Sequence, residues 1–120
     1  MELNEITEQI IGRAYQVANT LGVGFLEKVY ENALVYELRN TGMVVTQQWP
    51  IKVWYHEVVV GEYCADLFVN ETVIVELKAA KALDDIHMAQ CLNYLRATRV
   101  KTCLLINFGT PKIGVKRISL

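Results

Sequence analysis

The sequence predicts a single α/β domain, a sandwich in which helices flank a central mixed β-sheet. Two runs, residues 73–78 and 101–107, are built around the branched apolar segments Val73-Ile74-Val75 and Leu104-Leu105-Ile106, which are typical of buried strands. Residues 84–98 lie between them and have helical periodicity. A buried strand, a helix and a second buried strand predict a parallel pair joined by a right-handed crossover. A chain of 120 residues can bury one core, so we expect one domain over residues 1–120.

Three helices are expected. The first covers about residues 5–21, with Asn4 as its N-cap and an apolar stripe at helical spacing. The second covers about residues 25–41, between two glycine breaks. The third follows Asp84, a favourable N-cap, and ends at about Thr98.

The strands before the third helix are expected to be four. Residues 43–49 and 51–55 form two of them, with Pro50 as an interruption. His56-Glu57 then turns the chain into residues 58–69, where Gly61 predicts a bulge or bend. Residues 114–120 alternate like an edge strand. The expected order is therefore α-α-β-β-β-β-α-β-β.

The loop between residues 69 and 73 decides where Asp66 points. A two-residue turn at Asn70-Glu71 would place Asp66 opposite Val75, facing away from Glu76. A three-residue loop places Asp66 opposite Glu76, and it also aligns an apolar face made by Ala65, Leu67 and Val69 with Leu77, Val75 and Val73. Because a slip of one residue would spoil that face, we predict the three-residue loop or an equivalent bulge.

Three charged side chains, Asp66, Glu76 and Lys78, lie in this otherwise apolar stretch. Glu76 and Lys78 emerge on the same face of a strand, ~7 Å apart. Buried charges are costly unless they are paired, so one interpretation is a structural salt bridge. The other is a hard-cation site, in which two carboxylates take Mg²⁺ and Lys78 handles a phosphate or an attacking water.

Three motifs carry a resemblance to a known family. Asp66…Glu76-Leu77-Lys78 resembles the Asp…Glu-x-Lys signature of the PD-(D/E)XK nuclease superfamily. Residues 24–30, Gly-Phe-Leu-Glu-Lys-Val-Tyr, are similar to the G-x-x-E-x-x-Y pattern of the small bacterial GxxExxY proteins. Residues 90–94, Gln-Cys-Leu-Asn-Tyr, are similar to the Q-x-x-x-Y motif of the RecB-like branch. The motifs occur in the expected order, and the one departure is Ala65 where the superfamily pattern has Pro.

The resemblance implies a restriction-endonuclease-like sandwich that hydrolyses DNA phosphodiester bonds with Mg²⁺ or Mn²⁺. It implies that the metal ligands are Asp66, Glu76, the backbone carbonyl of Leu77 and, directly or through water, Glu27. Lys78 would orient the attacking water and stabilise charge on the phosphorane. Gln90 would position Lys78 or the phosphate.

Four more residues are candidates for substrate contact: Tyr30, His87, Tyr94 and Lys81. Tyr30 would be equally ordinary in a helix–sheet contact, and His87 as a satisfied structural histidine. Glu31 is interpreted as part of a solvated helix end. Three other aromatic side chains could stack on bases, although core or sheet-surface positions are favoured for them: Trp49, Trp54 and Tyr55.

Composition and charge distribution bear on the possible partners and on the location of the protein. The net charge is −1, but residues 1–77 hold four Lys/Arg and eleven Asp/Glu, whereas residues 78–120 hold eight and two. This asymmetry gives either a basic face for phosphates or, if the halves intermix, a field that cancels. No apolar run approaches a membrane span, and the acidic N-terminus lacks a signal-peptide pattern. Cys64, Cys91 and Cys103 show no C-x-x-C spacing and indicate reduced, packed thiols in a cytoplasmic protein.

Nucleic acid, most simply DNA, is therefore the expected partner, with no role at a membrane. A domain of this size has little surface for substrate selection, so a homodimer or a protein partner is also considered. The alternative function is a nuclease fold used as a nucleic-acid-binding or assembly module without catalysis. The sequence leaves open DNA against RNA and end against internal cleavage.

Overall fold

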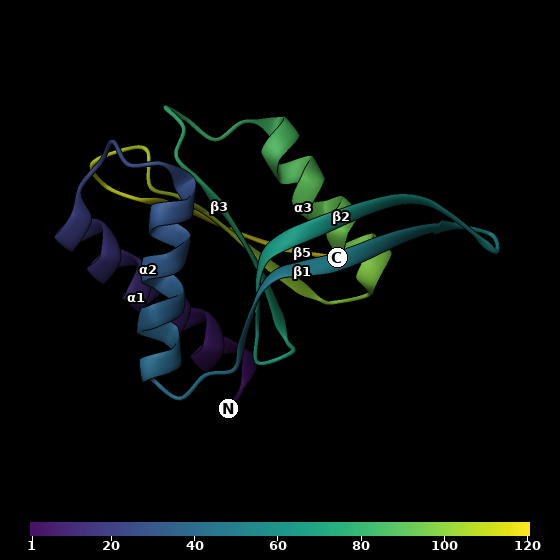
Figure 1. The fold of residues 1–120 in the computed structure, drawn as a ribbon, viewed down its shortest axis with the longest axis horizontal. Coiled ribbons are helices and arrows are strands. Elements are labelled where there is room, and N and C mark those ends of the chain that lie inside the picture. The colour runs from purple at the N-terminus through teal and green to yellow at the C-terminus, as the bar shows by residue number, and fades with distance from the viewer.

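A computed structural model describes all of residues 1–120 as three helices and one five-stranded sheet (Figure 1). In chain order the elements are α1 (Leu3–Leu21), α2 (Glu27–Asn40), β1 (Val45–Tyr55), β2 (Val58–Val69), β3 (Val73–Lys78), α3 (Asp85–Thr98), β4 (Thr102–Asn107) and β5 (Gly114–Ser119). None of the helices combines the length and the apolar composition that a membrane span requires.

The sheet is mixed, with the strand order β1-β2-β3-β4-β5. Only β3 and β4 are parallel, and α3 connects them, as the sequence predicts. All other neighbours are antiparallel. The prediction of four strands before the third helix was wrong, because β1 runs through Pro50 without a break. Pro50 is tolerated because β1 is the edge strand of the sheet, where a residue without an N–H need not break the ladder.

The sheet separates two apolar layers (Figure 1). The helices α1 and α2 cover one face, where the core includes Leu34, Leu38, Leu67, Val75 and Ile106. The helix α3 covers the other face, over a smaller core that includes Phe68, Ile74, Cys91, Leu95 and Leu105. The two faces of β3 therefore carry alternate residues, and the even-numbered Ile74 and Glu76 belong to the side of α3.

The helix boundaries fall within two residues of those predicted, but one cap differs. The first helix begins at Leu3, and Asn4 lies inside it, where its side chain accepts a hydrogen bond from Arg117 at 3.0 Å. Asp84 does cap α3, since its carboxylate accepts from the N–H groups of Ile86 and His87.

The β2–β3 hairpin has the predicted register. Leu67 pairs with Val75 and Val69 with Val73, so the loop is residues 70–72. Asn70 and Glu71 have φ of 51°, the left-handed conformation that a tight loop requires. Ala65 was predicted on the same apolar face as Leu67, but it packs in the core beneath α3. The reason is that regular pairing with β3 ends at Leu67, where β2 changes direction.

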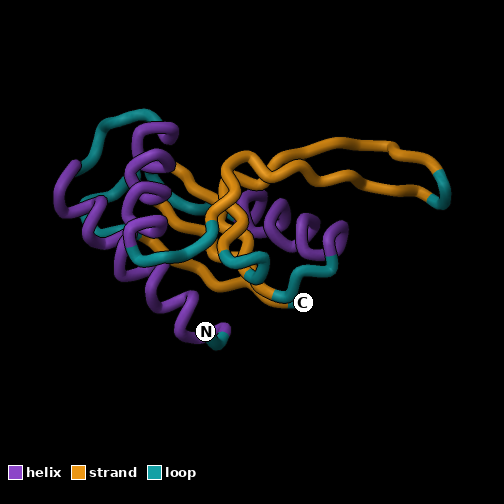
Figure 2. Tube along the Cα trace, turned by 60° about the horizontal axis from the view of Figure 1, so that its bottom comes forward, coloured by secondary structure: helices purple, strands orange, loops and turns teal.

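Beyond that point β1 and β2 continue together as a hairpin arm that projects from the body (Figure 2). Tyr55 pairs with Val58, so His56 and Glu57 form the predicted turn. The register shifts next to Val53, which pairs with Gly61, and this confirms the bulge expected there. The arm exposes Trp54, Tyr55, Val58, Val60 and Tyr63.

Trp49 and two of the three cysteines are packed against other side chains or buried, as predicted. Trp49 stacks on Phe68, with ring centroids 3.8 Å apart. All three cysteines are free, and Cys91 and Cys103 are buried as expected. Cys64 is exposed, contrary to the prediction, because it lies on the arm next to Tyr63, whose ring faces α3, and so points to the opposite face of the strand.

Candidate active site

Two carboxylates meet where the β2–β3 ladder stops. The Asp66 N–H donates to Glu76 Oε2 at 2.7 Å, and the Leu77 N–H donates to Asp66 Oδ2 at 2.8 Å. Each acid thus accepts from the backbone of the opposite strand, in place of the regular ladder that ends at Leu67 and Val75. The convergence of Asp66 and Glu76 follows from the predicted register of the hairpin.

Burial, together with a neighbouring negative charge, raises the pKa of each acid. Burial raises the pKa of Glu76 to about 8, and the neighbouring Asp66 charge adds to this shift. The pKa of Asp66 is also raised, first by burial and then by the charge of Glu31, although the Leu77 N–H opposes the shift. Two acids that resist losing both protons together form a site that a cation would complete.

Lys78 ends β3 and is half-buried. Its ammonium group forms no ion pair, although its charge lowers the pKa of both Asp66 and Glu76. The interpretation as a structural salt bridge therefore lacks its central contact. Because the Lys78 ammonium stays near the acid pair without being bound to it, it remains available to another anion.

Of the two glutamates considered on α2, Glu31 lies near the acid pair and Glu27 does not. The expectation that Glu27 would be the nearer of the two was therefore wrong. Glu31 is buried, and its carboxylate accepts from Gln48 at 3.0 Å, from Gln47 at 2.8 Å and from Lys28 at 3.0 Å. Glu27 is exposed at the first position of α2. The two residues are one helical turn apart, ~6 Å along the axis, and only the second turn faces the sheet.

Gln48 links Glu31 to Asp66 and was missed by sequence reasoning. Its Nε2 lies 3.0 Å from Glu31 Oε1 and 3.5 Å from Asp66 Oδ1. The residue has φ of 51°, which turns the side chain out of the regular alternation of β1. The only available signal was a pair of polar residues, Gln47-Gln48, within a predicted strand.

The helix α3 brings Gln90 and Tyr94 to the same region. Gln90 Nε2 donates to the Tyr94 hydroxyl at 3.0 Å. Burial raises the pKa of Tyr94 to about 12, and the charges of Glu76 and Asp66 contribute, which places the phenol within their field. The two polar residues of the Q-x-x-x-Y motif are thus joined to each other and border the acid pair.

The other three candidates for substrate contact, His87, Tyr30 and Lys81, lie in a helix cap, in the core and in an exposed loop. His87 Nδ1 accepts from the Asp84 N–H at 3.2 Å, so His87 completes the capping box of α3. Tyr30 is fully buried, stacks on Phe108 with centroids 4.7 Å apart and donates to the Gly22 carbonyl at 2.6 Å. Substrate contact by Tyr30 is therefore contradicted, because packing encloses its ring. Lys81 is exposed after β3 and forms no ion pair.

The donor set fits a divalent cation that keeps part of its water shell. No three His, Cys, Asp or Glu side chains are grouped closely enough to enclose an ion. Mg²⁺ sites ordinarily use one or two carboxylates, with water and substrate phosphate supplying the other oxygens. Asp66 and Glu76 provide two acids that repel each other and whose pKa values are raised, which is the chemistry that such an ion relieves.

Comparisons with known proteins identify the family and the fold. The family model described as the PD-(D/E)XK nuclease superfamily matches residues 4–118. Among curated proteins, no sequence matches the chain. The crystal structure of an alkaline exonuclease, LHK-Exo, from Laribacter hongkongensis is similar with a TM-score of 0.51 and 15% identity, over 94% of this chain and 81% of that one. The crystal structure of SSO0001 is similar with a TM-score of 0.54 and 17% identity, over 97% of this chain but only 59% of that one.

Proposed function

Because the chain belongs to the PD-(D/E)XK nuclease superfamily, we propose that it is a metal-dependent nuclease that hydrolyses DNA phosphodiester bonds at Asp66 and Glu76. The observation that carries the proposal is the acid pair itself. The two carboxylates are fixed by each other's strand, and their pKa values are raised. An ammonium group that no acid binds, that of Lys78, lies beside them. One structural neighbour is an alkaline exonuclease, which is consistent with the proposal.

The proposed ion is Mg²⁺ or Mn²⁺, held by Asp66, Glu76 and the Leu77 carbonyl. When bound, such an ion polarises a phosphoryl oxygen and lowers the pKa of a bound water. We assign the helix contribution to Glu31 in place of Glu27, because Glu31 is buried and joined to Asp66 through Gln48. Glu31 would act on the acid pair mainly by its charge, which already raises the pKa of Asp66.

The chain's own residues then have distinct roles in hydrolysis. A water oxygen attacks the phosphorus and gives up a proton to solvent, and the bond to the leaving oxygen breaks as that oxygen takes up a proton from solvent. The Lys78 ammonium orients the water and offsets negative charge on the phosphoryl oxygens. Gln90, fixed by its hydrogen bond to Tyr94, positions the phosphate or Lys78.

Within the superfamily we assign the chain to the GxxExxY kind and the RecB-like branch. Two observations support the assignment. Gly24 has φ of 108°, which favours glycine, and the Tyr30 hydroxyl bonds to both Gly22 and Phe25. Two fixed positions of the pattern, Gly24 and Tyr30, thus shape the loop before α2.

The proposal extends to the setting of the protein. Residues 1–120 would act as one domain, which a single sheet with helices on both faces supports. Three free cysteines favour a cytoplasmic location. Selection of the substrate would involve either a homodimer or a protein partner.

The test is Lys78→Met, which keeps the apolar stem and removes the charge. The parent should cleave DNA with Mg²⁺ or Mn²⁺, assayed over linear, circular, single-stranded and branched substrates. The variant should melt like the parent and bind Mn²⁺, while its cleavage rate falls by ~10²–10³. Lys81→Met is the matched control, because Lys81 is exposed in the adjoining loop.

The opposite outcome is equally distinct. A parent that cleaves none of these substrates with either metal, but whose Lys78→Met variant loses ~3–5 kcal/mol of stability, would favour an ion-pair cluster without catalysis. A parent that binds DNA without cleaving it would favour the binding or assembly module.

A further inference from the structure

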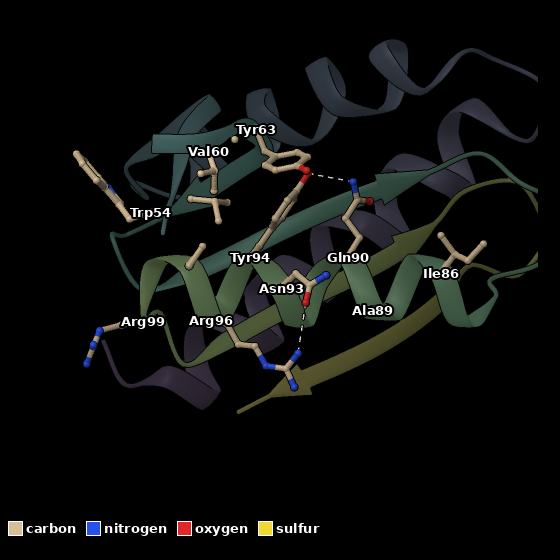
Figure 3. Close-up of a pocket in the computed structure, with 13 residues that line it drawn as sticks. Trp54, Val60, Tyr63, Ile86, Ala89, Gln90, Asn93, Tyr94, Arg96 and Arg99 are labelled. Atoms are coloured by element: carbon tan, nitrogen blue, oxygen red, sulfur yellow. Dashed lines mark hydrogen bonds between the residues drawn. The ribbon is translucent and has the colours of Figure 1, made fainter. Parts of the chain in front are cut away.

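A groove of about 900 Å³ runs between the hairpin arm and α3 (Figure 3). The arm contributes Trp54 and Tyr63, and α3 contributes Gln90, Asn93 and Arg96. Arg99, just past the end of α3, lies at the Trp54 end of the groove (Figure 3). The volume is in the upper part of the ~300–1,000 Å³ range of ligand sites.

The rings in this groove are exposed where most large aromatic side chains would be packed. Trp54 is 59% exposed and Tyr63 is 51% exposed. The centroids of the Tyr63 and Tyr94 rings lie 5.9 Å apart with an angle of 50° between the ring planes, so Tyr94 packs against one side of the Tyr63 ring. Such rings present flat faces on which a planar group can stack.

The charge of the groove has one sign. Arg96 and Arg99 line it, and no Asp or Glu does. Neither arginine forms an ion pair, and the only hydrogen bond of Arg96 in this region is to Asn93 at 3.3 Å. Two free guanidinium groups beside exposed rings fit a ligand that carries both anionic and planar groups.

One end of the groove reaches Tyr94, which lies within the field of the acid pair. Gln90 and Tyr94 line the groove, and the charges of Glu76 and Asp66 help to raise the pKa of Tyr94, to which Gln90 is hydrogen-bonded. Figure 3 shows Gln90 and Tyr94 joined by their hydrogen bond, with Arg96 and Arg99 farther along α3. A chain lying in the groove would therefore lead toward Asp66 and Glu76.

We propose that this groove binds a single strand of nucleic acid, with bases stacked on Trp54 and Tyr63 and phosphates at Arg96 and Arg99. The inference rests on the proposed function in that it names the form of substrate that reaches the acid pair. A duplex is disfavoured because its base faces are stacked within the helix, so the exposed rings would have nothing to stack on. An apolar contact with a second copy of the chain is disfavoured because it would bury two arginines without an anionic partner.

The experiment measures binding by fluorescence anisotropy of labelled oligothymidylate, alone or annealed to oligodeoxyadenylate. It is done in EDTA, so that binding does not depend on turnover, and at several salt concentrations. The variants are Trp54→Leu, Tyr63→Leu and the double variant Arg96→Gln/Arg99→Gln. Tyr55→Leu and Lys52→Gln are the controls, because both residues lie on the same arm outside the groove.

The parent should bind the single strand more tightly than the duplex. Each aromatic variant should weaken binding of the single strand by ~5- to 150-fold. The arginine variant should reduce the slope of log affinity against log salt by about 1.4, the value for two single-strand phosphate contacts. The controls should bind as the parent does.

Three results would overturn the inference: no binding of the single strand by the parent, tighter binding of the duplex, or equal losses in the controls. A dimer in light scattering that the groove variants dissociate, with strand binding unchanged, would assign the groove to a second copy. If the parent binds the strand through the groove but cleaves nothing with Mg²⁺ or Mn²⁺, the proposed function fails while this inference stands. If it cleaves and the groove variants bind normally, only this inference fails.

Discussion

Replacing Glu76 by glutamine tests whether the acid pair of Asp66 and Glu76 binds a divalent cation. Glu76→Gln keeps the size of the side chain and an oxygen that accepts from the Asp66 N–H, now 2.7 Å away. It removes the proton equilibrium and one charge. Any difference between variant and parent should therefore depend on pH and on metal.

The sign of the pH effect follows from the direction of the shift. Glu76 has a pKa of about 8 in the folded protein and an ordinary value of 4.5. The folded protein therefore holds this proton more tightly than the unfolded chain does. The stabilisation is complete below the ordinary pKa and is lost as the pH rises toward 8. At 1.36 kcal/mol per pKa unit, the free energy of unfolding of the metal-free parent should fall by ~3 kcal/mol between about pH 5 and pH 8.

Urea unfolding of the parent and Glu76→Gln, followed by circular dichroism in EDTA, measures this difference. The variant should lack the part of the pH dependence that Glu76 contributes. Adding Mn²⁺ at about 100 times its Kd should restore ~2.7 kcal/mol to the parent at pH 8 and nothing to the variant. Glu62→Gln is the control, since Glu62 is an exposed glutamate on β2. Parallel pH curves for parent and Glu76→Gln, or equal stabilisation of both by Mn²⁺, would refute the reasoning.

Three further predictions concern residues around the pair. Glu31→Gln should lower metal affinity, measured by Mn²⁺ titration, by ~10- to 100-fold, whereas Glu27→Gln should leave it unchanged. Equal effects would contradict the assignment to Glu31. Asn107→Ala removes the bonds of Asn107 to the Ala80 N–H and carbonyl, at 3.0 and 2.9 Å, and should cost ~2–4 kcal/mol in urea unfolding. Gly109→Ala would place a Cβ 2.1 Å from the Ala80 carbonyl oxygen, so it should lower the free energy of unfolding at least as much as Asn107→Ala does. A smaller loss of stability in urea unfolding would contradict this geometry.

The central strands were predictable because their pattern has one solution. The apolar runs of β3 and β4 are buried throughout, and the intervening helix leaves only a parallel crossover. Pro50 misled the prediction because its effect depends on the place of β1 in the sheet. A proline ends a central strand but not an edge strand, and the sequence does not say which strand lies at the edge.

In the candidate site, too, locally determined features were predictable and those that depend on tertiary placement were not. Asp66 and Glu76 were predicted to converge because a local hairpin fixes both, and one apolar face selects its register. Glu27 and Glu31 share one helical stripe, so choosing between them requires the angle at which α2 crosses the sheet. Gln48 was not predictable, since its role arises from a positive φ and from the approach of α2 to β1.

The place where the β2–β3 ladder ends connects the fold to the chemistry. Past Leu67 and Val75 the two strands no longer pair backbone to backbone, so the N–H groups of Asp66 and Leu77 have no regular ladder partner on the opposite strand. Because the ladder ends, each side chain instead takes a backbone N–H of the opposite strand and is held beside a like charge. The parallel partner β4 continues alongside through Lys78 and Asn107, so β3 remains fixed where β2 leaves it. The point where β2 leaves β3 is therefore both the place where the two carboxylates are held and the beginning of the hairpin arm.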